Sequence, residues 1–181
     1  MPRREAISWR VSRSGNSAAP ARRLASSNMR ASLLAPRGWY CFGSYGSGGD
    51  ALFVSPQPID TTNTFSSVRR GIAGPAIAIS RRFGDTSGRF DVAEIIARVF
   101  PTYRAFVTGV IEMFDLPAGS FTFGPYPEDK RAYKSNTVVE YSTPAQADGL
   151  GTYSWLKKDA SPSDGVAILI GQPPDLLLLS G

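Results

Sequence analysis

Residues 91–119, DVAEIIARVFPTYRAFVTGVIEMFDLPAG, form the longest periodic apolar stretch of the chain. Apolar side chains recur three or four positions apart along it, which is typical of an amphipathic α-helix with one buried face. They are Val92, Ile95, Ile96, Val99, Tyr103, Phe106, Val107, Val110, Ile111 and Phe114. Asp91, followed three residues later by Glu94, suits the start of a helix, and the segment LPAG (116–119) suits its end.

Pro101 interrupts this pattern. Proline lacks the backbone N–H and crowds the carbonyl of Ala97, four residues earlier. The apolar spacing nevertheless keeps its phase across the proline. The stretch therefore predicts one long, Pro-kinked helix that buries its apolar face against a sheet.

Short apolar or alternating runs on both sides of the helix predict strands at 39–42, 51–54, 76–80, 120–123, 136–142, 166–170 and 176–179. The Gly-rich residues 43–49 suggest a mobile hairpin loop, and 120–123 is expected to pair with 136–142. The last two runs are continuously apolar, which favours a hairpin of buried strands. Thr143-Pro144 suggests a short helix through Ala147. The expected class is α+β, with an antiparallel or mixed sheet and the long helix packed on one face.

Charge divides the chain into two parts. Residues 1–37 hold eight arginines and one glutamate, whereas residues 38–181 hold twelve basic and fourteen acidic groups. We interpret residues 1–37 as a disordered extension rich in Arg, Ser and Ala, and residues 38–181 as a single domain. The extension is open to three interpretations, namely a targeting segment, a basic arm for nucleic acid, or a plain unstructured tail.

The sequence excludes several chemistries. It contains no histidine and a single cysteine, Cys41, which removes Ser-His-Asp and Cys-His catalysis and the common zinc sites. The Gly-rich residues 43–49 lack the spacing of a P-loop or a dinucleotide fingerprint. No cofactor and no metal site is therefore expected. No apolar run reaches the length of a membrane span, so we expect a soluble protein. The sequence leaves its compartment open, with the cytoplasm favoured.

One candidate site is an anion-binding cluster. Arg81, Arg82 and Arg89 lie just before or at the start of the predicted helix, where the helix dipole favours negative charge. The alternative is a solvated loop in which these arginines are balanced by Asp85 and Asp91.

A second candidate is an interaction surface formed by Tyr126, Tyr133, Tyr153 and Trp155. Exposed aromatic side chains are common anchors at protein interfaces, although the same residues also suit a core. Together with the missing catalytic residue types, they favour a non-catalytic protein-binding module whose partner is another protein.

Two other functions are alternatives. A small carboxylate-dependent hydrolase would use Glu94, Glu112, Glu128 or Glu140, but no spacing brings two of these together. Glu140 lies on either the helix side or the open side of its strand, and only the first placement would bury it. Nucleic-acid binding would use the basic residues 1–37.

Overall fold

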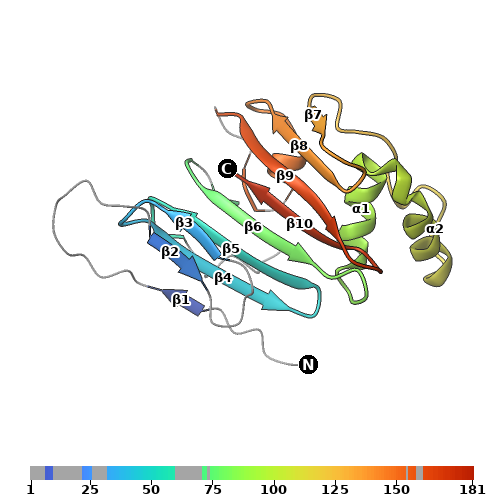
Figure 1. Ribbon diagram of the computed structural model, residues 1–181, viewed down its shortest axis with the longest axis horizontal. Coiled ribbons are helices and arrows are strands. Elements are labelled where there is room, and N and C mark those ends of the chain that lie inside the picture. The colour runs from blue at the N-terminus through green and yellow to red at the C-terminus, as the bar shows by residue number, and fades with distance from the viewer. Residues whose placement is uncertain are drawn as a thin grey trace.

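The computed structural model describes residues 7–9, 22–25, 32–59, 71–72, 74–153, 155–157 and 161–181 (Figure 1). The predicted disordered extension, residues 1–37, therefore lies mostly outside the described residues. Within it the structure describes the short strands β1 (Ile7–Trp9), β2 (Arg22–Ala25) and β3 (Ser32–Ala35). Ala35 is buried, so the packed part of the chain includes β3.

Most of the described strands belong to one antiparallel sheet. Besides β1, its members are β4 (Tyr40–Gly46), β5 (Gly49–Ser55), β6 (Ile77–Arg82), β7 (Lys130–Tyr133), β8 (Val138–Thr143), β9 (Ser163–Ile170) and β10 (Asp175–Ser180). Their order is β1-β4-β5-β6-β10-β9-β8-β7, and every neighbouring pair is antiparallel. β2 and β3 form a separate hairpin. The α+β class is thus confirmed, and the sheet is antiparallel rather than mixed.

The predicted long helix is divided in two. α1 (Arg89–Val99) ends before Pro101, a 3₁₀ turn, η1, covers Pro101–Tyr103, and α2 (Arg104–Met113) follows. Phe100 has φ −121° and ψ 69°, outside the helical region, because a residue that precedes proline is disfavoured there. α1 also begins two residues before Asp91, the predicted N-cap, and α2 ends before the predicted stop at 116–119.

α1 covers one face of the sheet, which we call the inner face. Its buried side chains, Val92, Ile95, Ile96 and Val99 among them, share one core with residues of β8, β9 and β10. The sheet residues in this core are Val139, Tyr141, Ala167, Leu169, Leu176 and Leu178. Full burial of each aliphatic side chain contributes about 1.5–3 kcal/mol, so this layer is a large part of the stability. The prediction of a helix packed on one face is confirmed.

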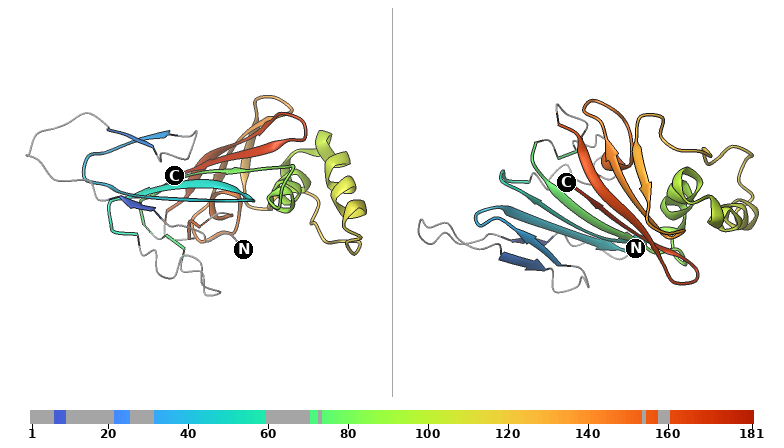
Figure 2. Two further views of the ribbon diagram at one scale, coloured as in Figure 1. Left: turned by 90° about the horizontal axis from the view of Figure 1, so that it is seen from below. Right: turned by 45° about the horizontal axis from the view of Figure 1, so that its top comes forward.

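Different segments cover the sheet over β4 and β5. On the inner face, Phe42 and Phe53 pack with Trp155 and Leu156. The opposite, outer face is covered there by the β2–β3 hairpin, which places Ala35 in one cluster with the buried residues Cys41, Leu52 and Val54. Figure 2 shows the hairpin as a second layer over this part of the sheet.

Three predicted segments are wrong. The Gly-rich residues 43–49 are mostly strand, because β4 runs to Gly46 and a two-residue turn at 47–48 leads into β5. The run at 120–123 is not a strand, and the hairpin partner of β8 is β7 instead. Residues 144–147 form a turn, and the short helical element comes later, as the 3₁₀ helix η2 (Leu150–Thr152).

Candidate interaction surface

An apolar strip lies on the outer face of β8, β9 and β10. Side chains alternate between the two faces of a strand. The residues next to each inner-face core residue along the same strand therefore point to the outer face. We call six of them the open strip: Val138, Val166, Ile168, Ile170, Leu177 and Leu179. Ile170 is 47% exposed and the other five are half-buried. Figures 1 and 2 show the β2–β3 hairpin over β4 and β5 but not over β9 and β10.

The register of the strands makes this strip continuous. Val138 pairs with Ile168, and Ile168 pairs with Leu177. In the next row Val166 pairs with Leu179, and Leu179 pairs with Ile79 of β6. Ile79 packs against the cluster beneath the hairpin. The open strip therefore continues the covered apolar surface of the same face without a polar break.

The predicted buried hairpin is confirmed on only one of its faces. The inner residues Ala167, Leu169, Leu176 and Leu178 are at most 5% exposed. Their outer neighbours keep part of their surface in solvent, although nothing in their sequence distinguishes them from core residues. A contiguous, partly exposed apolar surface of this kind is more informative than a single exposed leucine.

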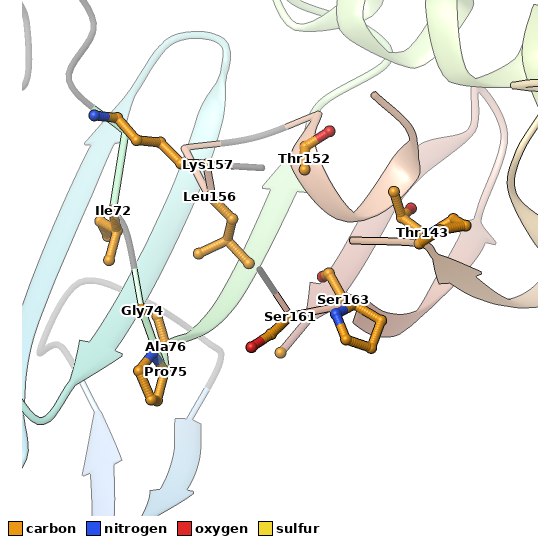
Figure 3. Close-up of a pocket in the computed structure, with 13 residues that line it drawn as sticks. Ile72, Gly74, Pro75, Ala76, Thr143, Thr152, Leu156, Lys157, Ser161 and Ser163 are labelled. Atoms are coloured by element: carbon orange, nitrogen blue, oxygen red, sulfur yellow. The ribbon is translucent and has the colours of Figure 1, made fainter. Parts of the chain in front are cut away.

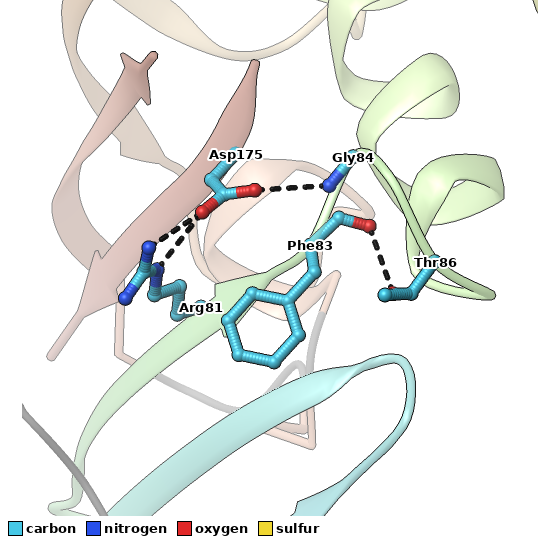
Figure 4. Close-up of polar contacts among 5 residues, drawn as sticks. All are labelled: Arg81, Phe83, Gly84, Thr86 and Asp175. Carbon is cyan, nitrogen blue, oxygen red and sulfur yellow. Dashed lines mark hydrogen bonds and ion pairs between the residues drawn. The ribbon is translucent and has the colours of Figure 1, made fainter. Parts of the chain in front are cut away.

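Charged side chains border the open strip. On the β7 side, Lys134 Nζ lies 2.8 Å from Glu140 Oε2, and both side chains are about half exposed. Glu140 thus occupies the open side of its strand. At the opposite corner, Arg81 Nη2 lies 2.6 Å from Asp175 Oδ2. The other oxygen of Asp175 accepts the Gly84 N–H at 3.0 Å (Figure 4).

Two more aspartates lie at the border. Asp164 is exposed at the end of β9. Asp50 pairs in register with Arg81, and burial raises its pKa while the charges of Arg81 and Arg82 lower it. Arg81 thus lies beside two carboxylates on this face, and the charge of Arg82 also acts on Asp50.

A smaller apolar patch lies at the ends of the two helices, and we call it the helix-end patch. It consists of Phe90, Met113 and Phe114, which are 37%, 69% and 43% exposed. The rings of Phe90 and Phe114 meet edge to face at 5.0 Å. The Arg89 guanidinium lies 5.2 Å from the Phe114 ring centroid. Phe114, expected in the helix core, is therefore a surface residue.

The three arginines of the predicted anion site do not converge. Arg81 and Arg82 are consecutive in β6 and point to opposite faces. Arg81 pairs with Asp175, and Arg82 Nε lies 3.0 Å from Asp91 Oδ2. Arg89 donates hydrogen bonds to the carbonyls of Asp85 and Thr86. Each cation already has a partner within the protein, but only the Arg82–Asp91 pair is one that the balanced-loop alternative named.

The four aromatic residues of the predicted interaction surface are also separated. Tyr133 is 52% exposed on the edge strand β7. Tyr126 lies beneath the Arg98 guanidinium, 4.4 Å from its ring centroid. The Tyr153 hydroxyl is 3.4 Å from Asp91 Oδ1, and Trp155 packs on Phe53 at 5.9 Å. Burial raises the pKa of Tyr126 and of Tyr153, as expected for partly covered phenols.

The candidate carboxylates show no catalytic arrangement. Glu94 pairs with Arg98 one helical turn away, and Glu140 pairs with Lys134. Glu112 and Glu128 are exposed. Among the described residues no group of three or more Asp, Glu, Cys or His side chains is placed to hold a metal ion.

A buried carboxylate that the sequence did not single out is Asp129. Its Oδ1 accepts the Thr143 hydroxyl at 2.7 Å, and its Oδ2 accepts the Leu150 N–H at 2.9 Å. The Thr143 hydroxyl oxygen accepts the Gly151 N–H at 2.9 Å. The network fixes η2 to the end of β8. Its polar atoms are engaged with one another, which indicates a structural role.

A pocket of about 200 Å³ opens beside this network (Figure 3). Its walls include Pro75, Leu156, Pro162 and the hydroxyl residues Thr152 and Ser163. Typical small-molecule sites occupy roughly 300–1,000 Å³ and carry convergent polar groups. Lys157 also belongs to the lining, and Figure 3 shows its amino group pointing away from the pocket.

No family model, curated protein or solved structure matches this chain. Within the described residues, no helix is both long and apolar enough to cross a membrane. The geometry of the chain itself is therefore the basis for assigning a function.

Proposed function

We propose that this chain is a non-catalytic protein-binding module and that it binds its partner through the open strip. The observation that carries the proposal is the partly exposed aliphatic surface of Ile168, Ile170 and Leu177, which continues a covered apolar face. Exposed apolar surfaces bordered by polar residues mark sites of protein association. The borders of this strip carry the ion pairs Lys134–Glu140 and Arg81–Asp175.

The size of the strip predicts modest affinity. Its side chains are already partly buried, so covering the remainder gives about 0.5–1 kcal/mol each, or roughly 3–6 kcal/mol in total. Association costs at least about 4 kcal/mol in lost freedom. Contacts with the charged border are needed in addition, and micromolar rather than nanomolar binding is expected.

Two further functions stand as weaker proposals. The hydrolase alternative has no support from the placement of Glu94, Glu112, Glu128 and Glu140, which lie in ion pairs or in solvent. Nucleic-acid binding depends on the arginines of residues 1–37, most of which lie outside the described residues. Salt-sensitive binding that disappears when residues 1–37 are deleted would support it.

The experiment is a comparative affinity capture with the full chain as bait. Ile170→Asp places a charge on the most exposed strip residue, and Met113→Asp is the matched control in the helix-end patch. A partner retained by wild type and Met113→Asp but lost by Ile170→Asp supports the proposal. Capture that is identical for all three baits contradicts it. Circular dichroism melting confirms that each bait is folded.

A further inference from the structure

We infer that the open strip binds a single amphipathic helix of a partner protein, which lies along β9 and carries basic residues near its ends. This inference rests on the proposed function and specifies the partner. It follows from the shape of the strip, from its borders and from the charge at its ends.

The strip is one helix wide. Three neighbouring strands span about 10 Å between the outer two, and a helix with its side chains is about 10 Å across. The β2–β3 hairpin bounds the strip on one side, beyond Ile79. The Lys134–Glu140 pair bounds it on the other. A second layer can therefore enter only between these two borders.

The long dimension of the strip runs with the strands. From Asp164 to Ile170 along β9 the distance is about 20 Å, which corresponds to roughly 13 residues of helix. The inner face of the same three strands is covered by α1, a helix of 11 residues. An outer helix of similar length would cover these strands on both faces.

A second copy of this chain fits the strip less well. The footprint of three strands over this length is about 300 Å², whereas a stable interface buries roughly 800 Å² on each partner. Larger sheet-on-sheet overlap would bring the second copy against the β2–β3 hairpin. A helix seated between the borders contacts their walls as well as the strip, so it gains area that two flat sheets do not.

The charges at the two ends of the strip indicate which charges the ends of the partner helix carry. Asp164 lies at one end, in the same row as the exposed Lys130 two strands away, and Asp175 with Asp50 lies at the other end beside Arg81. Among the described residues on this face, the ends therefore hold three carboxylates against two cations, a small excess of negative charge. Lysine or arginine in the first and last turns of the partner helix complements this excess, and an aliphatic stripe at i, i+3, i+4 and i+7 faces the strip.

The test uses synthetic helical peptides of about 14 residues and the full chain. The first has a leucine stripe with lysines in its end turns, the second has the same composition with the stripe scrambled, and the third carries glutamates in place of the lysines. Fluorescence anisotropy gives the affinities, and amide chemical shifts locate the contact. We expect the first peptide to bind at least about tenfold more tightly than the second and to shift amides of β8, β9 and β10.

Variants of the chain make the test specific. Ile170→Asp should weaken binding of the first peptide by about tenfold, while Met113→Asp leaves it unchanged. Asp164→Lys should weaken the lysine-ended peptide about threefold and favour the glutamate-ended one. Equal binding of striped and scrambled peptides, or shifts confined to the helix-end patch, would overturn the inference.

Three further outcomes also overturn it. One is a dimer in sedimentation analysis that Ile170→Asp dissociates, since a second copy then fills the strip. Another is binding to phosphatidylserine vesicles that Ile170→Asp abolishes. The third is a captured partner whose binding depends on the strip although the striped peptide does not bind. The proposed function then holds, and the inference of a helical partner fails. If neither capture nor peptide binding depends on the strip, both proposals fail.

Discussion

The backbone N–H of Gly124 donates a hydrogen bond of 3.0 Å to the carbonyl of Ala97, in the last turn of α1. In an unbroken helix this carbonyl would accept from residue 101, but Pro101 has no N–H to donate. The loop after α2 therefore returns to satisfy an acceptor that the proline leaves open. Gly124 adopts φ +95° at this point, a conformation that residues with a Cβ rarely take.

The first prediction concerns this glycine. Gly124→Ala should lower the free energy of unfolding by about 1–2 kcal/mol, because a Cβ there meets no atom within 4 Å and the cost is purely that of the backbone. Gly109→Ala is the matched control, since it also has open space but lies in the interior of α2. It should raise stability by roughly 0.5–1 kcal/mol. Urea denaturation measures both free energies of unfolding. An equal effect of the two substitutions would show that the backbone conformation of Gly124 carries no special cost.

The second prediction compares the covered and open halves of the outer face. Leu52 is fully buried beneath the β2–β3 hairpin, while Leu177 lies in the open strip. Leu52→Ala should cost about 2–4 kcal/mol, because it leaves a cavity. Leu177→Ala should cost about 1 kcal/mol or less. Similar losses in urea denaturation would show that the strip is covered within the isolated chain.

Part of this architecture could be predicted from the sequence. The 3.6-residue period identified the buried face of α1, and the continuous apolar runs identified β9 and β10. The same period failed for Phe114, which lies just beyond the last residue of α2, although Val107 and Val110 of the same stripe are buried in the core. Phase continuity across a proline did not guarantee one continuous helix.

The errors in the sheet have a common cause. β7 reads KRAY, and as an exposed edge strand it has no buried face to create an alternating pattern. Residues 120–123 do alternate, but Phe121 packs into the core whereas Phe123 is 42% exposed, and the segment forms a loop. In both places the hydrophobic pattern does not predict strand pairing, which is decided by backbone hydrogen bonds.

The candidate surface could not be predicted from the sequence for a different reason. A continuous apolar run does not show which face of its strand is covered, and that depends on where β2 and β3 pack. The Asp129 network was equally hidden, because Thr143 lies 14 residues away and Asp129 stands in a charged turn that resembles a solvated loop.

The third prediction tests that network. Asp129→Ala should cost about 2–3 kcal/mol, because the Thr143 hydroxyl and the Leu150 N–H lose their acceptor in a buried site. The adjacent Glu128→Ala is the control, and since Glu128 is exposed its effect should stay within about 0.5 kcal/mol. A small effect of both in chemical denaturation would refute a structural role for Asp129.

The fourth prediction contrasts two ion pairs at the border of the strip. Asp175→Ala should cost about 1–2 kcal/mol, because it removes the partner of Arg81 and also the acceptor of the Gly84 N–H. Glu140→Ala breaks the more exposed pair with Lys134 and should cost less than about 0.5 kcal/mol. Thermal melts at low and high salt measure both losses of stability. A larger loss for Glu140→Ala than for Asp175→Ala would refute the argument that the less exposed ion pair contributes more.

The fifth prediction concerns stability at alkaline pH. Burial raises the pKa of Tyr141 and of Tyr153, and the charges of Asp91 and Glu94 raise that of Tyr153 further. Above about pH 10, where an unfolded tyrosine ionises, the folded state therefore holds more protons than the unfolded state. Stability should fall as pH rises through this range, whereas below it the two phenols contribute no pH dependence.

Phenylalanine variants separate the two phenols. Tyr153→Phe should leave stability at neutral pH almost unchanged, since its hydroxyl makes only a 3.4 Å contact, and should move alkaline unfolding to higher pH. Tyr141→Phe should cost about 1 kcal/mol at neutral pH, because its hydroxyl donates to the Leu179 carbonyl at 2.8 Å. Absorbance at the tyrosinate band, followed together with circular dichroism, should show these two groups ionising only as the chain unfolds. Their ionisation before unfolding would mean that solvent reaches the core between η2, α1 and β10.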